Sequence, residues 1–135
     1  MARVLLADTE LQSRLALKSI LSTAGYAVSG AATASEAIDK LDEGEYQLVL
    51  ADLRSESEDA GPRLLAYARQ KEFRPATALL ASDLSESGGE PMTDRAANHA
   101  VHISNENLFY LLDRVAELIS HRAGRRIQRT LVRAV

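Results

Sequence analysis

The sequence predicts a doubly wound α/β domain built around a parallel β-sheet. Short apolar runs alternate along the chain with longer segments of helical period, which is typical of successive βαβ units. The first run, residues 3–7, is apolar at every position after Arg3, as expected for a parallel strand that is buried on both faces. With 135 residues the chain can form one core without crosslinks, and its lack of cysteine excludes disulfides, zinc ribbons and thiol catalysis.

The strand at residues 3–7 leads into the first helix. Thr9 is expected to cap this helix, and Gly25 is expected to end it in the C-cap position. The expected buried side of the helix consists of four apolar residues, namely Leu11, Leu15, Ile20 and Leu21.

The second and third strands continue the same alternation. A strand at residues 26–30 is followed by a helix that begins near residues 33–35 and that Gly44 closes. The third strand, residues 46–51, has the strongest β character in the chain. Asp52 is therefore expected at the carboxyl end of a central strand.

The next unit begins with a helix for which Pro62 is well placed in the first turn and which ends near Lys71. The fourth strand is expected at residues 76–80. Residues 82–91 are rich in serine and glycine, which indicates a loop, so any helix after it is short, at about residues 93–98.

The last strand is expected at residues 100–103, and the last helix begins after Ser104 or Asn105. Its expected buried stripe consists of Leu108, Leu111, Leu112, Val115, Leu118 and Ile119. Residues 1–121 are thus expected to form one domain, and residues 122–135 a basic tail or linker.

Charge is distributed unevenly between these two parts. The net charge is −3, but residues 121–135 contain five arginines and no acid, so residues 1–120 carry −8. The tail has the spacing of a basic amphipathic helix that packs on a partner, dimerises or leads into an output domain. Clustered arginines also allow nucleic-acid binding, and a solvated terminus is an equally open interpretation.

Two carboxylates are expected at neighbouring strand ends. Asp8 follows the first strand and Asp52 ends the third. Ligands of doubly wound sheets collect at the carboxyl ends of the strands, and oxygen ligands of this kind suit Mg²⁺. Either acid alone is explained equally well as a helix cap, whereas two at matching strand ends favour a binding site.

Residues 2–120 resemble the receiver domains of two-component response regulators. The matching segments are Arg3-Val4-Leu5-Leu6-Ala7-Asp8-Thr9-Glu10, Gly25-Tyr26-Ala27-Val28, Glu36-Ala37 and Leu48-Val49-Leu50-Ala51-Asp52-Leu53. The resemblance implies a CheY-like, flavodoxin-like (βα)5 fold with a five-stranded parallel sheet of order 2-1-3-4-5. It also implies that Asp52 is the phosphoacceptor, and that Asp8, Asp52 and the backbone carbonyl of Arg54 are ligands of Mg²⁺.

The resemblance further implies a role in phosphorelay signal transduction. A histidine kinase or phosphotransfer protein would supply the phosphoryl group, and a downstream protein would read the result, with a homodimer as an open alternative. The sequence contains no apolar run long enough to span a bilayer and no signal-peptide pattern, so a cytoplasmic protein is expected.

Four positions depart from the family pattern at the phosphate site and the switch. Thr9 replaces the second acid, Leu80 replaces the hydroxyl residue that ends strand four, and Ser104 replaces the lysine after strand five. Val101 stands where the family has its switch aromatic residue, and Ser82 is a candidate substitute hydroxyl. We therefore expect weak Mg²⁺ binding and slow phosphorylation.

The lead interpretation is a divergent receiver that works through protein binding. A pseudo-receiver that is never phosphorylated is the alternative. The proline turn of the family is replaced by Glu56, Glu58 and neighbouring polar residues, for which a solvated loop is favoured over metal ligation. A small Mg²⁺-dependent phosphatase-like enzyme is less favoured, since the chain lacks G-x-x-x-x-G-K-[ST], G-x-G-x-x-G, G-x-S-x-G and a D-x-D at its first strand.

Overall fold

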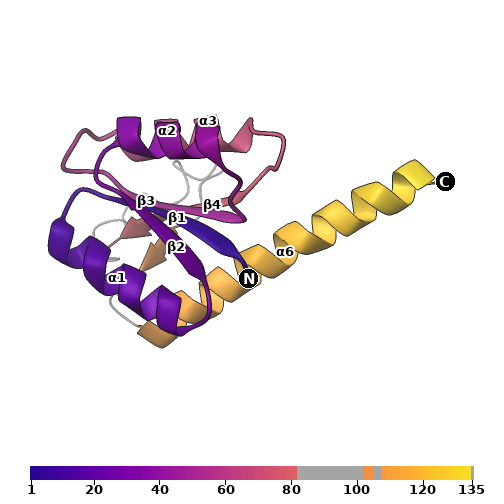
Figure 1. Ribbon diagram of the computed structural model, residues 1–135, viewed down its shortest axis with the longest axis horizontal. Coiled ribbons are helices and arrows are strands. Elements are labelled where there is room, and N and C mark those ends of the chain that lie inside the picture. The colour runs from indigo at the N-terminus through magenta and orange to yellow at the C-terminus, as the bar shows by residue number, and fades with distance from the viewer. Residues whose placement is uncertain (82–101, 105–107, 135) are drawn as a thin grey trace.

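A five-stranded parallel sheet with helices on both faces forms the domain (Figure 1). The strand order is β2-β1-β3-β4-β5, which confirms the predicted fold class and sheet order. The strands are β1 (Arg3–Asp8), β2 (Ala27–Ala31), β3 (Leu48–Asp52), β4 (Ala76–Ala81) and β5 (His102–Ser104). The helices are α1 (Leu11–Thr23), α2 (Ala34–Glu43), α3 (Ala60–Arg69) and α6 (Leu108–Ala134).

This computed structural model describes residues 1–81, 102–104 and 108–134. The predicted loop at residues 82–91 and the predicted helix at residues 93–98 lie outside the described residues.

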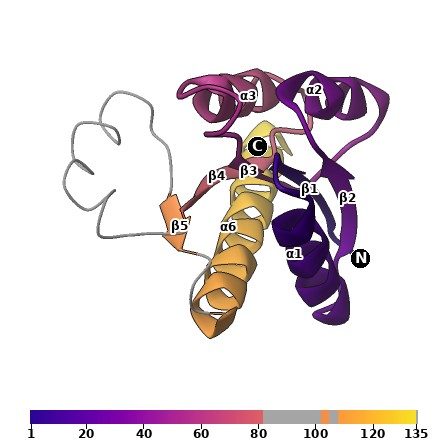
Figure 2. The same cartoon turned by 90° about the vertical axis from the view of Figure 1, so that its left-hand side faces the viewer.

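The sheet separates two apolar cores (Figure 2). Helices α2 and α3 cover one face, where Leu5 and Val49 are buried, and α1 and α6 cover the other, where Leu6 and Leu50 are buried. Successive residues of one strand point to opposite faces. Because both faces are covered, the central strands are apolar at consecutive positions, as the sequence indicated.

The ends of α1 agree with the prediction only in part. Glu10 and not Thr9 is the N-cap residue, and no side chain caps the helix, so the predicted cap is wrong. At the other end Gly25 follows the C-cap residue Ala24 with φ of 105°. Glycine adopts this left-handed conformation without strain, which confirms it as the stop signal.

The buried side of α1 also differs from the prediction. Leu17 and Leu21 are buried, whereas Leu11 and Leu15 are 57% and 56% exposed. The half-buried Arg14 takes the core-facing position one turn before Leu17. An arginine can occupy such a position because its aliphatic stem packs while its guanidinium reaches a polar partner.

Helices α2 and α3 begin close to their predicted positions. Thr33 caps α2 by accepting a hydrogen bond from the Glu36 backbone N–H at 3.0 Å, and the Glu36 carboxylate accepts one from the Ala32 N–H at 2.8 Å. Gly44 is the C-cap residue of α2, as predicted. Pro62 lies in the first turn of α3, where its missing N–H costs nothing.

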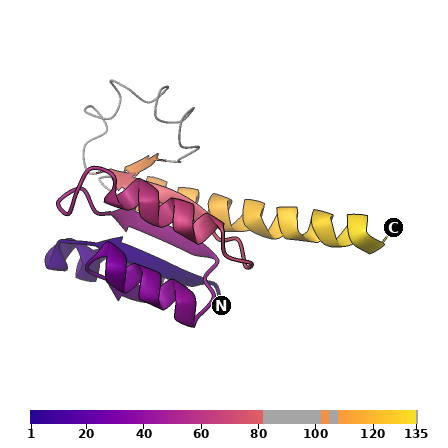
Figure 3. The same cartoon turned by 90° about the horizontal axis from the view of Figure 1, so that it is seen from above.

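Helix α6 continues past the sheet into the predicted tail (Figures 1 and 3). Leu111 and Val115 are buried as predicted, but Leu108 at the start of the helix is 39% exposed. The helix runs without a break across the boundary expected at residue 121, so the separation of a tail from the domain stays a prediction. No helix in the described part of the chain combines the length and apolar character needed to cross a bilayer.

Arg122 fixes α6 to the loop that precedes β4. Its side chain is buried, and its guanidinium donates to the carbonyl oxygens of Phe73 at 2.6 Å and Arg74 at 3.1 Å. Arg74 itself has a positive φ of 42°. The first arginine of the predicted tail is therefore packed against the domain.

We predict that Arg122→Met lowers the free energy of unfolding by about 2–3 kcal/mol, because two charge-assisted hydrogen bonds are lost, one of them to the carbonyl of the buried Phe73. Urea unfolding followed by circular dichroism measures the change. Arg114→Met in the same helix removes a solvent-accessible pair with Glu117 and should cost less than about 1 kcal/mol. Equal effects of the two substitutions would contradict the role of Arg122.

A polar cluster joins α2 to the end of α3. The Asp42 carboxylate accepts hydrogen bonds from the Tyr67 hydroxyl at 2.6 Å and from the Lys71 ammonium group. The ammonium also lies 4.9 Å from the centre of the Tyr67 ring. The hydrogen bond from Lys71, followed by that from Tyr67, lowers the pKa of Asp42 below its ordinary value of 3.8.

This pKa shift predicts a pH-dependent contribution to stability. Because the pKa is lower in the folded state, the contribution is present above the ordinary value of 3.8 and is lost as the pH falls through the folded pKa. We expect Asp42→Asn to lower the melting temperature at neutral pH, and the difference from the wild type to close in acid. Thermal unfolding across this pH range tests it, and a difference that persists unchanged in acid would be inconsistent with it.

Candidate functional site

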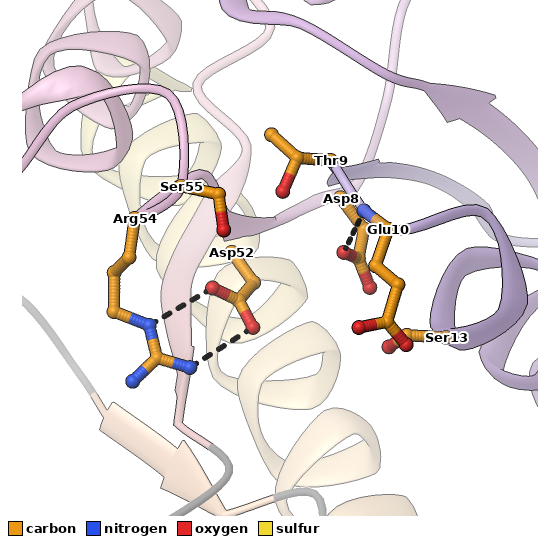
Figure 4. Close-up of a pocket in the computed structure, with 7 residues that line it drawn as sticks. All are labelled: Asp8, Thr9, Glu10, Ser13, Asp52, Arg54 and Ser55. Atoms are coloured by element: carbon orange, nitrogen blue, oxygen red, sulfur yellow. Dashed lines mark hydrogen bonds and ion pairs between the residues drawn. The ribbon is translucent and has the colours of Figure 1, made fainter.

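The register between β1 and β3 brings the two predicted carboxylates together. Asp8 and Asp52 are direct partners across the two parallel strands, at the carboxyl edge of the sheet. Beyond this edge lies an open pocket of about 370 Å³ (Figure 4). The pocket is lined by Asp8, Thr9, Glu10, Ser13, Asp52, Arg54 and Ser55.

Asp8 is a buried carboxylate with one oxygen left without a protein partner. It is 2% exposed, and its Oδ1 accepts a hydrogen bond from the Glu10 backbone N–H at 3.0 Å. Its Oδ2 is buried and has no hydrogen-bond partner among the described residues. Buried carboxylate oxygens are normally satisfied, so an unpaired one beside a polar pocket fits a site for a cation.

Asp52 is paired with the side chain of Arg54. The Arg54 Nε donates to Oδ1 at 3.0 Å and its Nη2 donates to Oδ2 at 3.2 Å, so both carboxylate oxygens are engaged (Figure 4). The Asp52 side chain is 17% exposed and that of Arg54 is 54% exposed. Only the backbone carbonyl of Arg54 was predicted from the sequence to take part in the site. The sequence signal for its side chain is a cation two residues beyond the strand-end acid.

A second arginine approaches the site from α1. Arg14 donates from Nη1 to the backbone carbonyl of Asp8 at 2.7 Å. A Cβ added to Gly30 in β2 would lie 3.3 Å from the Arg14 Cδ, so this glycine leaves room for the arginine stem. Arg14 was not predicted to reach the site, because the apolar spacing placed the neighbouring Leu15 on the buried side of α1.

Arg54 and Ser55 line the pocket, whereas the loop beyond Ser55 is tied to α2. The carbonyl of the buried Leu53 accepts hydrogen bonds from the Glu56 and Ser57 N–H groups at 3.0 and 3.2 Å. The Glu56 carboxylate accepts from the Ala34 N–H at the start of α2, at 3.0 Å. Neither Glu56 nor Glu58 lines the pocket, and the interpretation of this segment as a solvated loop stays a prediction.

The positions that depart from the family pattern fall in different places. Thr9 lines the pocket, whereas Leu80 is 3% exposed and packs in the core beneath α1 and α6. Ser104 ends β5 and pairs in register with Ala81 of β4. Val101 and Ser82, the predicted switch position and substitute hydroxyl, lie outside the described residues.

The residues at the pocket fit a divalent cation, but only partly. Asp8 offers a free carboxylate oxygen, while Thr9 offers a neutral hydroxyl and Asp52 already holds a guanidinium. Within the described residues no three acidic, histidine or cysteine side chains are grouped closely enough to form a metal site by themselves. A cation here would therefore depend on two carboxylates together with main-chain and water oxygens.

The proteins that this chain resembles were found by comparing its fold with solved structures. No family model matches the sequence, and no curated protein does. TrrA, a response regulator of Thermotoga maritima solved with Mg²⁺-BeF, is 25% identical with a TM-score of 0.72, over 87% of this chain and 99% of that one. A CheY-like receiver domain protein of Methanospirillum hungatei is 23% identical with a TM-score of 0.75, over 93% and 98%. This is the fold of CheY-like receiver domains.

Two further solved structures add detail to the receiver likeness. TrrA has also been solved in complex with the histidine kinase ThkA. A Rhodopirellula baltica structure named adenylate cyclase has a TM-score of 0.83 at 14% identity, over 99% of this chain and 98% of that one. That identity shows a shared fold and carries no activity over to this chain.

We predict that Asp8→Asn raises the free energy of unfolding by about 1 kcal/mol in metal-free buffer. The substitution keeps the oxygen that accepts from Glu10 and removes a buried charge with an unpaired oxygen. Chemical unfolding in the presence of a chelator measures this change. Asp113→Asn makes the same change at an exposed position of α6 and should have no effect. A loss of stability in Asp8→Asn would show that the carboxylate is satisfied in solution.

Proposed function

We propose that this chain is a receiver-type signalling domain of a cytoplasmic phosphorelay, with Asp52 as its phosphoacceptor and protein binding as its output. The observation that carries the proposal is the pairing of Asp8 with Asp52 at the open carboxyl edge of a receiver fold. In doubly wound sheets this edge is where ligands bind.

Phosphorylation would proceed by in-line attack of an Asp52 oxygen on the phosphorus of the donor. A new P–O bond forms while the bond to the leaving group breaks, and the leaving group departs with the electron pair. Mg²⁺, which Asp8, Asp52 and the Arg54 carbonyl would hold, supplies charge neutralisation when bound. In the resting arrangement Arg54 donates a hydrogen bond to each Asp52 oxygen, which lowers the nucleophilicity of the oxygen that attacks.

Three features support a slow reaction in place of an efficient one. Thr9 lacks the negative charge of a second metal-binding acid, and the apolar Leu80 cannot donate a hydrogen bond to a phosphoryl oxygen. Ser104 brings no positive charge to the end of β5. Because phosphoryl transfer depends mainly on positioning and charge stabilisation, each replacement raises the barrier.

The proposed partners are a phosphate donor and a downstream protein. The complex of TrrA with ThkA supports a histidine kinase or a phosphotransfer protein as donor. Leu11 and Leu15 support the same assignment, because they present exposed apolar side chains on the first turns of α1, next to the pocket residues Glu10 and Ser13. The downstream protein, or a second copy of the chain, would read the result.

A constitutive pseudo-receiver is the second candidate, and the Asp52–Arg54 pair is the observation that favours it. An acid whose two oxygens are held by an internal cation can serve the fold without ever accepting phosphate. Under this alternative the same surfaces bind partners without a phosphorylation switch. A phosphatase-like enzyme would instead hydrolyse a phosphorylated substrate in many turnovers and would not remain phosphorylated itself.

Incubation with acetyl phosphate and Mg²⁺, followed by intact-mass measurement, separates these functions. We expect the wild type to gain the mass of one phosphoryl group, more slowly than an ordinary receiver treated in parallel. Asp52→Asn should gain none, whereas Asp39→Asn, at an exposed position of α2, should behave as the wild type. No gain in the wild type would contradict the phosphoacceptor assignment and leave the pseudo-receiver.

A further inference from the structure

We infer that Arg54 is the internal counterion of this site and competes directly with Mg²⁺ for the Asp52 carboxylate. The inference rests on the proposed function, because it concerns the cation that serves the same carboxylate. It assigns to the Arg54 side chain a regulatory role separate from that of its backbone carbonyl.

The geometry of the pair is that of a two-point clamp. Nε and Nη2 of one guanidinium meet the two oxygens of one carboxylate, at 3.0 and 3.2 Å. This fork arrangement is the strongest that a side-chain cation makes with a carboxylate, and lysine cannot reproduce it. A divalent cation binds through the same oxygens, so the clamp and the metal compete for the lone pairs and the charge of Asp52.

The backbone between the two residues holds Arg54 in place for this contact. Leu53 separates them and is 1% exposed, and its carbonyl is fixed by hydrogen bonds from Glu56 and Ser57. The turn that follows β3 therefore directs residue 54 back over the end of its own strand. A pre-positioned arginine loses little conformational entropy when it closes on Asp52.

The two partners differ in their exposure to solvent. Asp52 is 17% exposed, so its charge is only partly screened by water, whereas the Arg54 side chain is 54% exposed. When it turns away, the guanidinium remains tethered two residues from the site. Its positive charge still opposes the approach of a cation.

Asp8 provides an independent observation that the pocket suits a cation, because only one of its two strand-end acids has both oxygens paired. Its buried Oδ2 has no partner among the described residues, although Asp52 directly across the strands has both oxygens paired. Arg14 reaches the Asp8 backbone carbonyl and not its carboxylate. The site would thus have two arrangements, one with Arg54 on Asp52 and one in which Asp8 and Asp52 hold a metal.

The experiment is a titration of Mg²⁺ into the full chain without any phosphate donor. Amide chemical shifts of Thr9, Glu10 and Ser55 report binding by NMR. We expect Arg54→Met to bind Mg²⁺ about tenfold more tightly than the wild type, since a clamp and a nearby positive charge are both removed. Arg54→Lys should fall between them, because it keeps the charge and loses the two-point geometry.

Arg63→Met is the matched control. Arg63 also forms an ion pair with an acid of the same loop region, Asp59, at 3.5 Å, but it does not line the pocket. The Arg63→Met variant should bind Mg²⁺ with the same affinity as the wild type. In the Asp52→Asn background, replacement of Arg54 should no longer produce the tenfold gain.

Equal Mg²⁺ affinity in the wild type and Arg54→Met would overturn the inference, and so would weaker binding in the variant. A failure of both proteins to bind Mg²⁺ would also overturn it, since Arg54 would then not be the group that limits binding. None of these outcomes involves phosphoryl transfer, so the intact-mass experiment judges the phosphoacceptor assignment separately.

Discussion

The parallel register between β1 and β3 is the constraint on which the rest of the site depends. It places Asp8 beside Asp52 at one edge of the sheet. The register is fixed by burial, because consecutive residues of each strand belong to separate apolar cores above and below the sheet. A slip of one residue would exchange the two faces of a strand and expose the wrong set of side chains. The packing of the cores therefore positions two charged groups that take no part in it.

The two acids meet very different surroundings although they are neighbours in the sheet. Asp52 has a fork of hydrogen bonds from Arg54, while one oxygen of Asp8 has no partner among the described residues. A buried charge left unsatisfied costs stability, which proteins accept mainly where a ligand or a reaction uses the group. The asymmetry favours a site in which Asp8 is available to a cation while the Arg54 guanidinium holds Asp52.

The fold could be predicted from the sequence because local residue patterns determine most of its strands and helix ends. Continuous apolar strands, Gly25 and Gly44 each carry their own structural signal, and the structure confirms them. The rotation of α1 could not be predicted, since Leu11 and Leu15 have helical spacing as regular as that of Leu17 and Leu21. Only packing against the sheet selects between the two faces. In the site, the strand-end acids were predictable from position, whereas the reach of Arg14 and Arg54 depends on side-chain paths that spacing does not encode.

The most direct test of this account is a pair of crystal structures of the protein, one grown in a chelator and one at high Mg²⁺ concentration. The account predicts that without metal the Arg54 guanidinium is clamped on both oxygens of Asp52. At high Mg²⁺ it predicts a cation between Asp8 and Asp52, with the guanidinium turned into solvent. A guanidinium remote from Asp52 in the metal-free crystals, or a cation bound with the clamp still closed, would contradict the central role given to this pair.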